Sequence, residues 1–208
     1  MMSEPNKIAF IGYSGHAYVC IETAQQMGYE IIGYYDVKKV EENPYDLSFL
    51  GNEEGFENNE GFLFGSIGDN KIRQHIYDKI SKIKKGVFTS LIHPTAIISN
   101  TVVIEDNTLV SAAAIVNALS VIETGCIINT GAIIEHECHI KAFVHIAPRA
   151  VLAGNVTVRK RSFIGVGAVV KQGITIGKDV IVGAGAVVVK DIPDNQVVVG
   201  NPAKQLRK

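Results

Sequence analysis

The sequence predicts a chain of two parts: an α/β N-terminal domain of Rossmann-like type over residues 1–92, and an all-β parallel β-helix over residues 93–208. Three observations support this prediction. Sixteen consecutive six-residue units run without insertion from Ala96 to Asp191. Ahead of them, apolar segments of strand and helix character alternate, as in a small parallel sheet. His93-Pro94 separates the two patterns, because proline cannot continue regular strand pairing.

The six-residue units share a bulky aliphatic third residue. A helix would repeat near 3.6 residues and a plain strand at 2, so a period of six indicates a short strand followed by a turn. The residue two positions earlier is usually small, which suits a narrow prism interior. Three units would form one triangular coil, and stacked coils would share one core. The sixteen third residues are Ile98, Ile104, Val110, Val116, Ile122, Ile128, Ile134, Ile140, Ile146, Leu152, Val158, Ile164, Val170, Ile176, Val182 and Val188.

The N-terminal segment has an alternating pattern of strands and helices. We expect loops over Lys38–Glu60, which is acidic and polar. The expected strands are Lys7–Gly12, Glu30–Tyr35 and Phe62–Gly68, and the expected helices are His16–Met27 and Asp69–Lys82.

The bulk properties exclude several classes of protein. The net charge is −1, so no strong field attracts nucleic acid or an anionic membrane. The three cysteines form no CxxC pair, which argues against a disulfide framework and a zinc ribbon. No apolar run approaches the length of a membrane span, and the N-terminus has no signal-peptide pattern. We therefore expect a cytoplasmic protein.

Gly12 and Gly15 lie between a predicted strand and a predicted helix. In that setting, backbone N–H groups at the helix N-terminus can hold a phosphate. Asp36 closes the next strand, where a nucleotide ribose or base is often bound. The full GxGxxG pattern is absent, so a tight turn without a ligand remains open, and a dinucleotide domain of the NAD type is disfavoured.

Three histidines fall in the middle of the repeats. His136 lies near a predicted corner, with Glu137 beside it and Asn129 in the preceding unit, and a carboxylate can orient an imidazole for general-base catalysis. His139 and His145 each precede an inward isoleucine and should point outward. Because outward residues on different faces of a prism diverge, we expect no metal site.

Several motifs together resemble the PglD/NeuD group of bacterial sugar acetyltransferases, whose hexapeptide repeats form a left-handed β-helix. Besides the repeats, they are Gly12–His16, Gly68-Asp69-Asn70 with Arg73, Asn129-Thr130 through His136-Glu137, Asp191–Pro193 and Gly200–Lys204. The resemblance implies direct acetyl transfer from acetyl-CoA to the 4-amino group of a UDP-linked amino-dideoxy sugar.

The resemblance also implies roles for individual residues. His136 would be the general base, Glu137 its orienting partner, and Asn129 would lie near the acceptor sugar. His145 would contact the thioester region of acetyl-CoA, and the remaining coenzyme contacts would come from Gly154, Val166, Gly183 and Lys204. The uridine diphosphate would be held by Gly12, Ser14, Gly15, His16, Asp36, Gly68, Asp69 and Asn70.

Alternatives and assembly complete the expectations. O-acetylation of a sialic acid, a GDP-linked amino sugar as acceptor, and a non-catalytic β-helix that serves as a binding or assembly module all remain open. Outward apolar residues favour a closed symmetric assembly, which the resemblance makes a homotrimer with acetyl-CoA between neighbouring chains. Those residues are Val103, Leu109, Ile115, Val121, Ile127, Ile133, Val151, Val169 and Val187.

Overall fold

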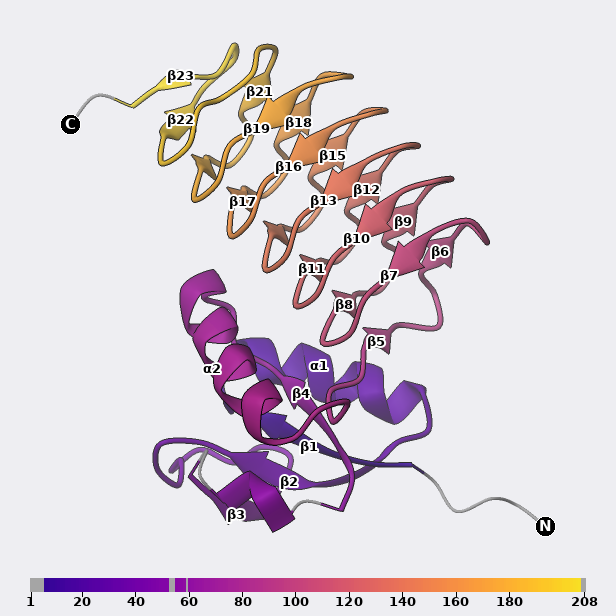
Figure 1. The fold of residues 1–208 in the computed structure, drawn as a ribbon, viewed down its shortest axis with the longest axis vertical. Helices are drawn as coiled ribbons and strands as arrows, with labels where there is room; N and C mark the ends of the chain where they lie inside the picture. The colour runs from indigo at the N-terminus through magenta and orange to yellow at the C-terminus, as the bar shows by residue number, and fades with distance from the viewer. Residues whose placement is uncertain (1–5, 53–54, 59, 207–208) are drawn as a thin grey trace.

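The computed structural model describes residues 6–52, 55–58 and 60–206, and it contains the two predicted parts (Figure 1). The N-terminal sheet has four parallel strands in the order β3-β2-β1-β4. These strands are β1 Lys7–Ile11, β2 Glu30–Tyr35, β3 Phe49–Gly51 and β4 Phe62–Gly65. The helices are α1 Gly15–Gln26, α2 Asn70–Ile83 and the 3₁₀ helix η1 Gly55–Asn58.

The two faces of this sheet are covered by different elements, because side chains alternate along a strand. Ile8 and Phe10 of β1 pack with α1, whereas Ala9 and Ile11 pack with α2 and η1. The chain reverses its strand order between β1 and β4, the point at which ligands bind in open parallel sheets.

Two expectations for this region were wrong. The segment Lys38–Glu60 is not all loop, because it contains β3 and η1. A three-residue edge strand carries too short a pattern to be seen in sequence, and it forms because the backbone of β2 offers partners. Tyr34 N–H donates to Ser48 O at 2.9 Å, and Asp36 N–H donates to Gly51 O at 3.2 Å. Strand β4 also ends at Gly65 rather than at Gly68.

The C-terminal part is a parallel β-helix with three faces, and the sixteen predicted units between residues 97 and 188 each contribute one two-residue strand. Face 1 consists of β6 Ile97–Ile98, β9 Ile115–Val116, β12 Ile133–Ile134, β15 Val151–Leu152, β18 Val169–Val170 and β21 Val187–Val188. Face 2 consists of β7 Val103–Ile104, β10 Val121–Ile122, β13 His139–Ile140, β16 Thr157–Val158 and β19 Thr175–Ile176. Face 3 consists of β5 Leu91–Ile92, β8 Leu109–Val110, β11 Ile127–Ile128, β14 His145–Ile146, β17 Phe163–Ile164, β20 Ile181–Val182, β22 Val197–Val199 and β23 Lys204–Gln205.

The second residue of each of the sixteen strands is the predicted bulky residue. From Val110 to Val188 these residues are buried in a single apolar cluster, with small residues such as Ala132 and Cys138 between them. Neighbouring coils are in register at 18 residues, so Val121 pairs with His139 and Ile133 with Val151. The last strand, β23, turns back to pair antiparallel with β22.

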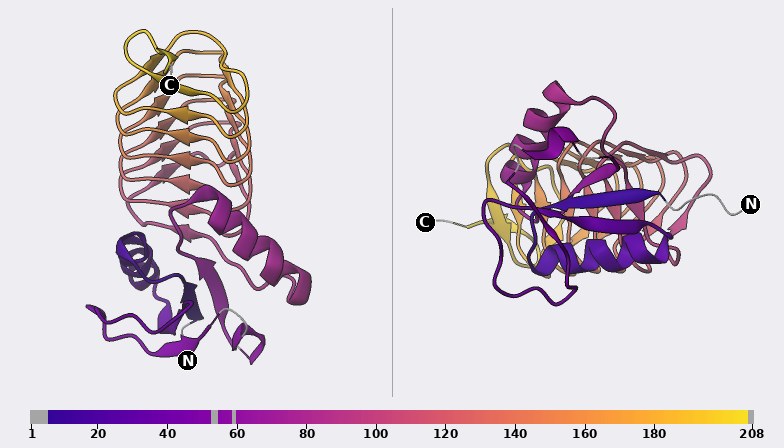
Figure 2. Two further views of the ribbon diagram at one scale, coloured as in Figure 1. Left: turned by 90° about the vertical axis from the view of Figure 1, so that its left-hand side faces the viewer. Right: turned by 90° about the horizontal axis from the view of Figure 1, so that it is seen from below.

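The N-terminal domain packs on face 3 of the β-helix, at the end where the repeats begin (Figures 1 and 2). Leu91, Leu109 and Ile127 of face 3 belong to the same apolar cluster as α1 and β1. Leu109 and Ile127 were expected to be exposed outside the prism, and this was wrong: they are 0% and 1% exposed because the N-terminal domain covers them. Strand β5 already pairs with β8, so the first strand of face 3 precedes His93-Pro94.

Candidate active site

A cleft of about 380 Å³ opens at the carboxyl ends of β1, β2 and β4. It brings together several residues that the sequence predicts for nucleotide binding, whereas Gly15 and His16 continue into α1 and do not line it. The lining residues are Ile11, Gly12, Tyr13, Ser14, Asp36, Val37, Ser66, Ile67, Gly68, Asp69, Ile72 and Ile76.

The β1–α1 turn is held rigidly at the floor of this cleft. Gly12 has φ +90°, and a Cβ there would lie 2.7 Å from Cγ1 of Ile67, so only glycine fits. The Asp36 carboxylate accepts from the backbone N–H of Tyr13 at 2.9 Å and of Val37 at 2.7 Å. Ser66 Oγ donates to Gly12 O at 2.5 Å, so the turns after β1, β2 and β4 are tied to one another.

The two helices whose N-termini reach the cleft differ in capping. Asp69 caps α2, since its Oδ1 accepts from the N–H groups of Lys71 and Ile72 at 2.9 Å each. Ser14 stands at the N-cap of α1 without a side-chain capping bond. The positive end of α1 is therefore the one that an anion can approach, while a carboxylate already occupies the end of α2.

His136 and Glu137 form the corner between face 1 and face 2. His136 Nδ1 lies 3.0 Å from Glu137 Oε2, and the two side chains are 51% and 58% exposed. Because a carboxylate only accepts, this contact places the proton of the imidazole on Nδ1 and leaves Nε2 as an acceptor. Glu137 has φ +60°, the left-handed conformation that recurs at the corners.

Gly154 lies one coil beyond His136, directly against its ring. A Cβ on Gly154 would lie 2.5 Å from both Cε1 and Nε2 of His136, a distance that real contacts do not show. The absence of a side chain at Gly154 therefore determines where the imidazole rests.

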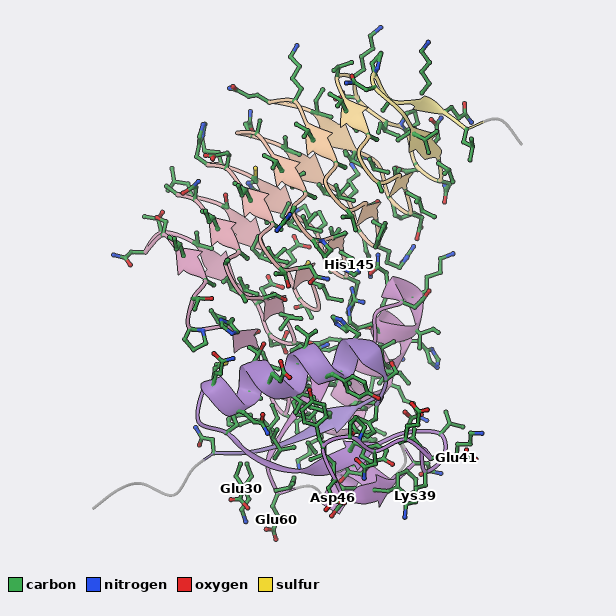
Figure 3. All side chains as sticks on the ribbon, turned by 180° about the vertical axis from the view of Figure 1, so that it is seen from behind. Glu30, Lys39, Glu41, Asp46, Glu60 and His145 are labelled. Carbon is green, nitrogen blue, oxygen red and sulfur yellow. The ribbon has the colours of Figure 1, made fainter. Side chains whose placement is uncertain are left out.

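His145 lies on face 3 where the β-helix meets the two helices, as Figure 3 shows. Its Nε2 is 3.1 Å from Asn129 Nδ2, and its ring centroid is 6.2 Å from that of His16 and 5.0 Å from that of Phe163. Burial first, and then the charge of Arg73, lower the pKa of His145 to about 3 and that of His16 to about 4. Both imidazoles are thus neutral near pH 7.

A second cleft of about 560 Å³ adjoins the first, because Gly68 and Asp69 line both. It separates the start of α2 from the upper part of face 3. Asn70 lines it and donates through Nδ2 to the carbonyls of Arg161 at 3.0 Å and Ser162 at 3.2 Å. Its lining residues are Gly68, Asp69, Asn70, Lys71, Arg161, Phe163, Asp179 and Ile181.

The other predicted coenzyme residues lie outside both clefts. Val166 is 51% exposed at a corner of the β-helix, and Lys204 is exposed on β23. Gly183 is a glycine for packing, since a Cβ there would lie 2.7 Å from Cγ1 of Val199. Within the part of the chain that the structure describes, no group of three or more His, Cys, Asp or Glu side chains is arranged to hold a metal ion. Neither α1 nor α2 is long and apolar enough to cross a bilayer.

Sequence reasoning missed Ser66, Ile67 and the contacts of Arg73. Ser66 immediately follows β4, beside the point where the strand order reverses. A polar residue at the carboxyl end of a strand at that point was the available sign of a ligand site. Ile67 gave no such signal, because its role is to fill the space above Gly12.

Comparisons with known proteins identify relatives that match nearly the whole chain. Residues 7–80 match the family described as the PglD N-terminal domain. A histidine-to-asparagine variant of perosamine N-acetyltransferase from Caulobacter crescentus, solved with CoA and GDP-perosamine, is 36% identical, with a TM-score of 0.92 over 97% of both chains. The acetyltransferase domain of PglB from Neisseria gonorrhoeae is 38% identical, with a TM-score of 0.90 over 97% of this chain and 100% of that domain. WeeI from Acinetobacter baumannii AYE shares the fold at 24% identity, with a TM-score of 0.85 over 96% of this chain and 99% of that one.

Proposed function

Because this chain belongs to the PglD-type family of sugar N-acetyltransferases with a left-handed β-helix, we propose that it transfers the acetyl group of acetyl-CoA to the 4-amino group of a UDP-linked amino-dideoxy sugar. The observation that carries the choice of acceptor is the cleft after β1, β2 and β4, with the uncapped N-terminus of α1 at its edge. A diphosphate fits that end of the helix, and Asp36 lies where the nucleoside would follow.

The transfer is direct in this proposal. The amine nitrogen attacks the thioester carbonyl, the C–S bond breaks, and the CoA thiolate leaves. Nε2 of His136 takes the proton that the nitrogen loses and passes it to the leaving sulfur, while Glu137 holds the ring. Cys20 lies 3.8 Å from His16, but full burial raises the pKa of its thiol far above neutrality, so it is no nucleophile for a covalent acetyl-enzyme.

The same family membership supports a role for acetyl-CoA as co-substrate. PglB from Neisseria gonorrhoeae was solved with acetyl coenzyme A, and the perosamine enzyme with CoA. We assign the coenzyme to a groove between neighbouring chains, with Gly154 on the corner between faces 1 and 2 of one chain, and Val166, Gly183 and Lys204 on the face 3 side of the next. His145 and Asn129 would lie toward the reacting end. The backbone N–H of Gly154, next to the His136 ring, is our candidate for stabilising the oxyanion.

A GDP-linked amino sugar is the second candidate acceptor. It is favoured by one observation, the GDP-perosamine bound in the perosamine N-acetyltransferase structure. A free sialic acid is disfavoured, because it would leave the uncapped end of α1 without a phosphate. Turnover assays with acetyl-CoA and UDP- or GDP-linked 4-amino sugars decide among these acceptors. Absence of acetylation of every nucleotide sugar would contradict the proposal.

We further propose that the active site is shared between copies of the chain in a homotrimer. The His136 corner joins faces 1 and 2 and is therefore opposite face 3, on which the domain with the nucleotide cleft packs. Within a single chain, the proposed base and the proposed acceptor site therefore lie on opposite sides of the β-helix. Exposed apolar residues on the prism, such as Ile97, Val103 and Val169, support burial against neighbouring chains.

Complementation tests the shared site. Chains with His136→Ala lack the proposed base, and chains with Gly15→Val carry a branched side chain at the N-terminus of α1, where the phosphate is proposed to bind. The fold should tolerate the valine, because a Cβ at Gly15 meets nothing within 4 Å. Refolded mixtures should regain about a quarter of wild-type activity, since random assembly pairs an intact cleft with an intact base at that frequency. Light scattering should give the mass of three chains. Mixtures as inactive as each variant alone would contradict a shared site.

A further inference from the structure

Arg73 of α2 is the largest of the fully buried side chains in the described part of the chain, at 1% exposed. All five N–H donors of its guanidinium are used. Nε donates to Gly125 O at 2.7 Å, and Nη1 donates to Ile67 O at 2.8 Å and Gly68 O at 3.1 Å. Nη2 donates to Asn70 Oδ1 at 2.8 Å and to Phe143 O at 3.3 Å.

None of these five acceptors is ionised: four are backbone carbonyls and one is a side-chain amide. Burial lowers the pKa of Arg73 to about 10, so the side chain is still charged at neutral pH. A buried charge without a carboxylate partner is costly, and proteins normally pair it. An apolar residue of the same size would avoid that cost but would leave these five acceptors without a donor, so the reason for the arginine lies in the groups that it joins.

The acceptors identify that reason, because they belong to different parts of the molecule. The carbonyls of Ile67 and Gly68 lie in the turn that lines the nucleotide cleft. Gly125 and Phe143 occupy the same corner of two successive coils, and a Cβ at Gly125 would lie 2.4 Å from the Phe143 ring. The planar guanidinium of Arg73 therefore joins the wall of the cleft to the β-helix.

We propose that Arg73 is a positioning residue for the acetyl acceptor: it fixes the Gly68 turn, and with it the nucleotide sugar, at one distance and orientation from the β-helix. This inference rests on the proposed function, which places the nucleotide sugar in that cleft. It assigns Arg73 no contact with the substrate.

A second contact across the same junction supplies a matched control. Arg161 of the β-helix is paired with Asp179 through Nε at 2.7 Å and Nη2 at 2.6 Å, and its Nη1 donates to Gln74 Oε1 at 2.8 Å. Gln74→Met breaks this link between α2 and the β-helix but leaves the Gly68 turn untouched. It should affect stability without affecting the acceptor.

The test compares Arg73→Lys with Gln74→Met. Lysine has three donors on one atom and cannot span the five acceptors, so the Gly68 turn loses its tie to the coils. We expect the KM for the nucleotide sugar to rise roughly tenfold or more in Arg73→Lys, while the KM for acetyl-CoA changes less than about twofold. Both KM values should stay at the wild-type level in Gln74→Met. An Arg73→Lys protein that only melts at a lower temperature, with both KM values unchanged, would overturn the proposal.

Hydrogen exchange on the unaltered protein gives a second test, which holds even if Arg73→Lys does not fold. Binding of UDP or GDP should slow amide exchange in residues 66–69 and also around Gly125 and Phe143, which lie outside the cleft. Protection confined to the cleft would overturn the coupling. No protection anywhere would instead remove the proposed nucleotide site, and this inference with it.

Discussion

The N-terminal domain and the β-helix position their functional groups by different means. In the N-terminal domain, the turns after β1, β2 and β4 each have their own shape and are joined by specific contacts, such as Ser66 to Gly12 and Asp36 to Tyr13. In the β-helix, the corners repeat one backbone conformation, a positive φ every six residues from Asn107 to Gly185, and they differ in the side chains that occupy them. His136 is distinguished by its neighbours, Glu137 beside it and Gly154 one coil away. In the proposed mechanism, binding therefore depends on an irregular backbone, and catalysis depends on particular side chains within a regular one.

Among the changes in the β-helix, His136→Ala is expected to lower kcat the most. We expect kcat to fall by roughly 10²–10⁴, the usual contribution of a general base, with the melting temperature unchanged because the side chain is exposed. Steady-state kinetics and thermal unfolding measure the two quantities. Turnover near the wild-type rate in a folded variant would exclude His136 as the base.

Gly154→Ala tests whether the neighbouring coil positions the base. The added Cβ would overlap the His136 ring, so the imidazole must turn away, and a shift of about 1 Å is expected to lower kcat on the order of 10²-fold. Gly55→Ala is the matched control, since its Cβ would meet neighbours only at 3.6 Å and 3.7 Å. If Gly154→Ala retained full kcat, the stacking of His136 on Gly154 would have no catalytic role.

Acidification tests the junction between the two halves. Folding lowers the pKa of His16 to about 4 and of His145 to about 3, chiefly by burial, so below about pH 6.5 the unfolded chain binds more protons than the folded one. Stability should therefore be complete above that pH and decline below it. Each histidine should cost roughly 2 kcal/mol at pH 5.

Urea unfolding at pH 7.5 and pH 5 measures this loss. The difference between the two pH values should shrink in His16→Gln and remain in His139→Gln, because His139 is exposed. An equal loss in both variants would show that other groups cause the acid sensitivity.

Glu137→Gln is the mildest of the four changes. Glutamine can still accept from Nδ1 of His136, so the ring orientation is partly kept, and only the charge beside it is lost. We expect kcat to fall several-fold, well short of the loss in His136→Ala, as judged by kinetics on the two variants in parallel. A loss as large as that of His136→Ala would show that the carboxylate does more than orient the imidazole.

The sequence predicted the β-helix better than the N-terminal domain for a physical reason. A period of six leaves one inward aliphatic residue per unit, and a shift of a single residue would expose all of them, so the positions from Ile98 to Val188 define the register. Strand β3 has no such redundancy. It is three residues long and exists because β2 provides hydrogen-bond partners along its edge.

The candidate site was predicted in part. Gly12 and Asp36, which the strand–turn–helix pattern indicated, come together in one cleft with Ser14 and Gly68, which the family resemblance implied. The proximity of His145 to His16 was not predicted, because it arises from packing of one domain on the other. Arg73 belongs to the same class: nothing local in α2 indicates that its side chain reaches carbonyls more than 50 residues away in the chain.

The 18-residue register gives the molecule a fixed unit of length. An insertion of one whole coil between the junction with the N-terminal domain and His136 would move His136 about 4.8 Å along the β-helix axis and return it to the same corner. An insertion of a single six-residue unit would be shorter, yet it would carry the base round to a different face. Homologues that vary the height of this prism are therefore expected to differ by multiples of 18 residues between the junction and His136, because smaller steps would turn this residue away from the chain that the proposed trimer places beside it.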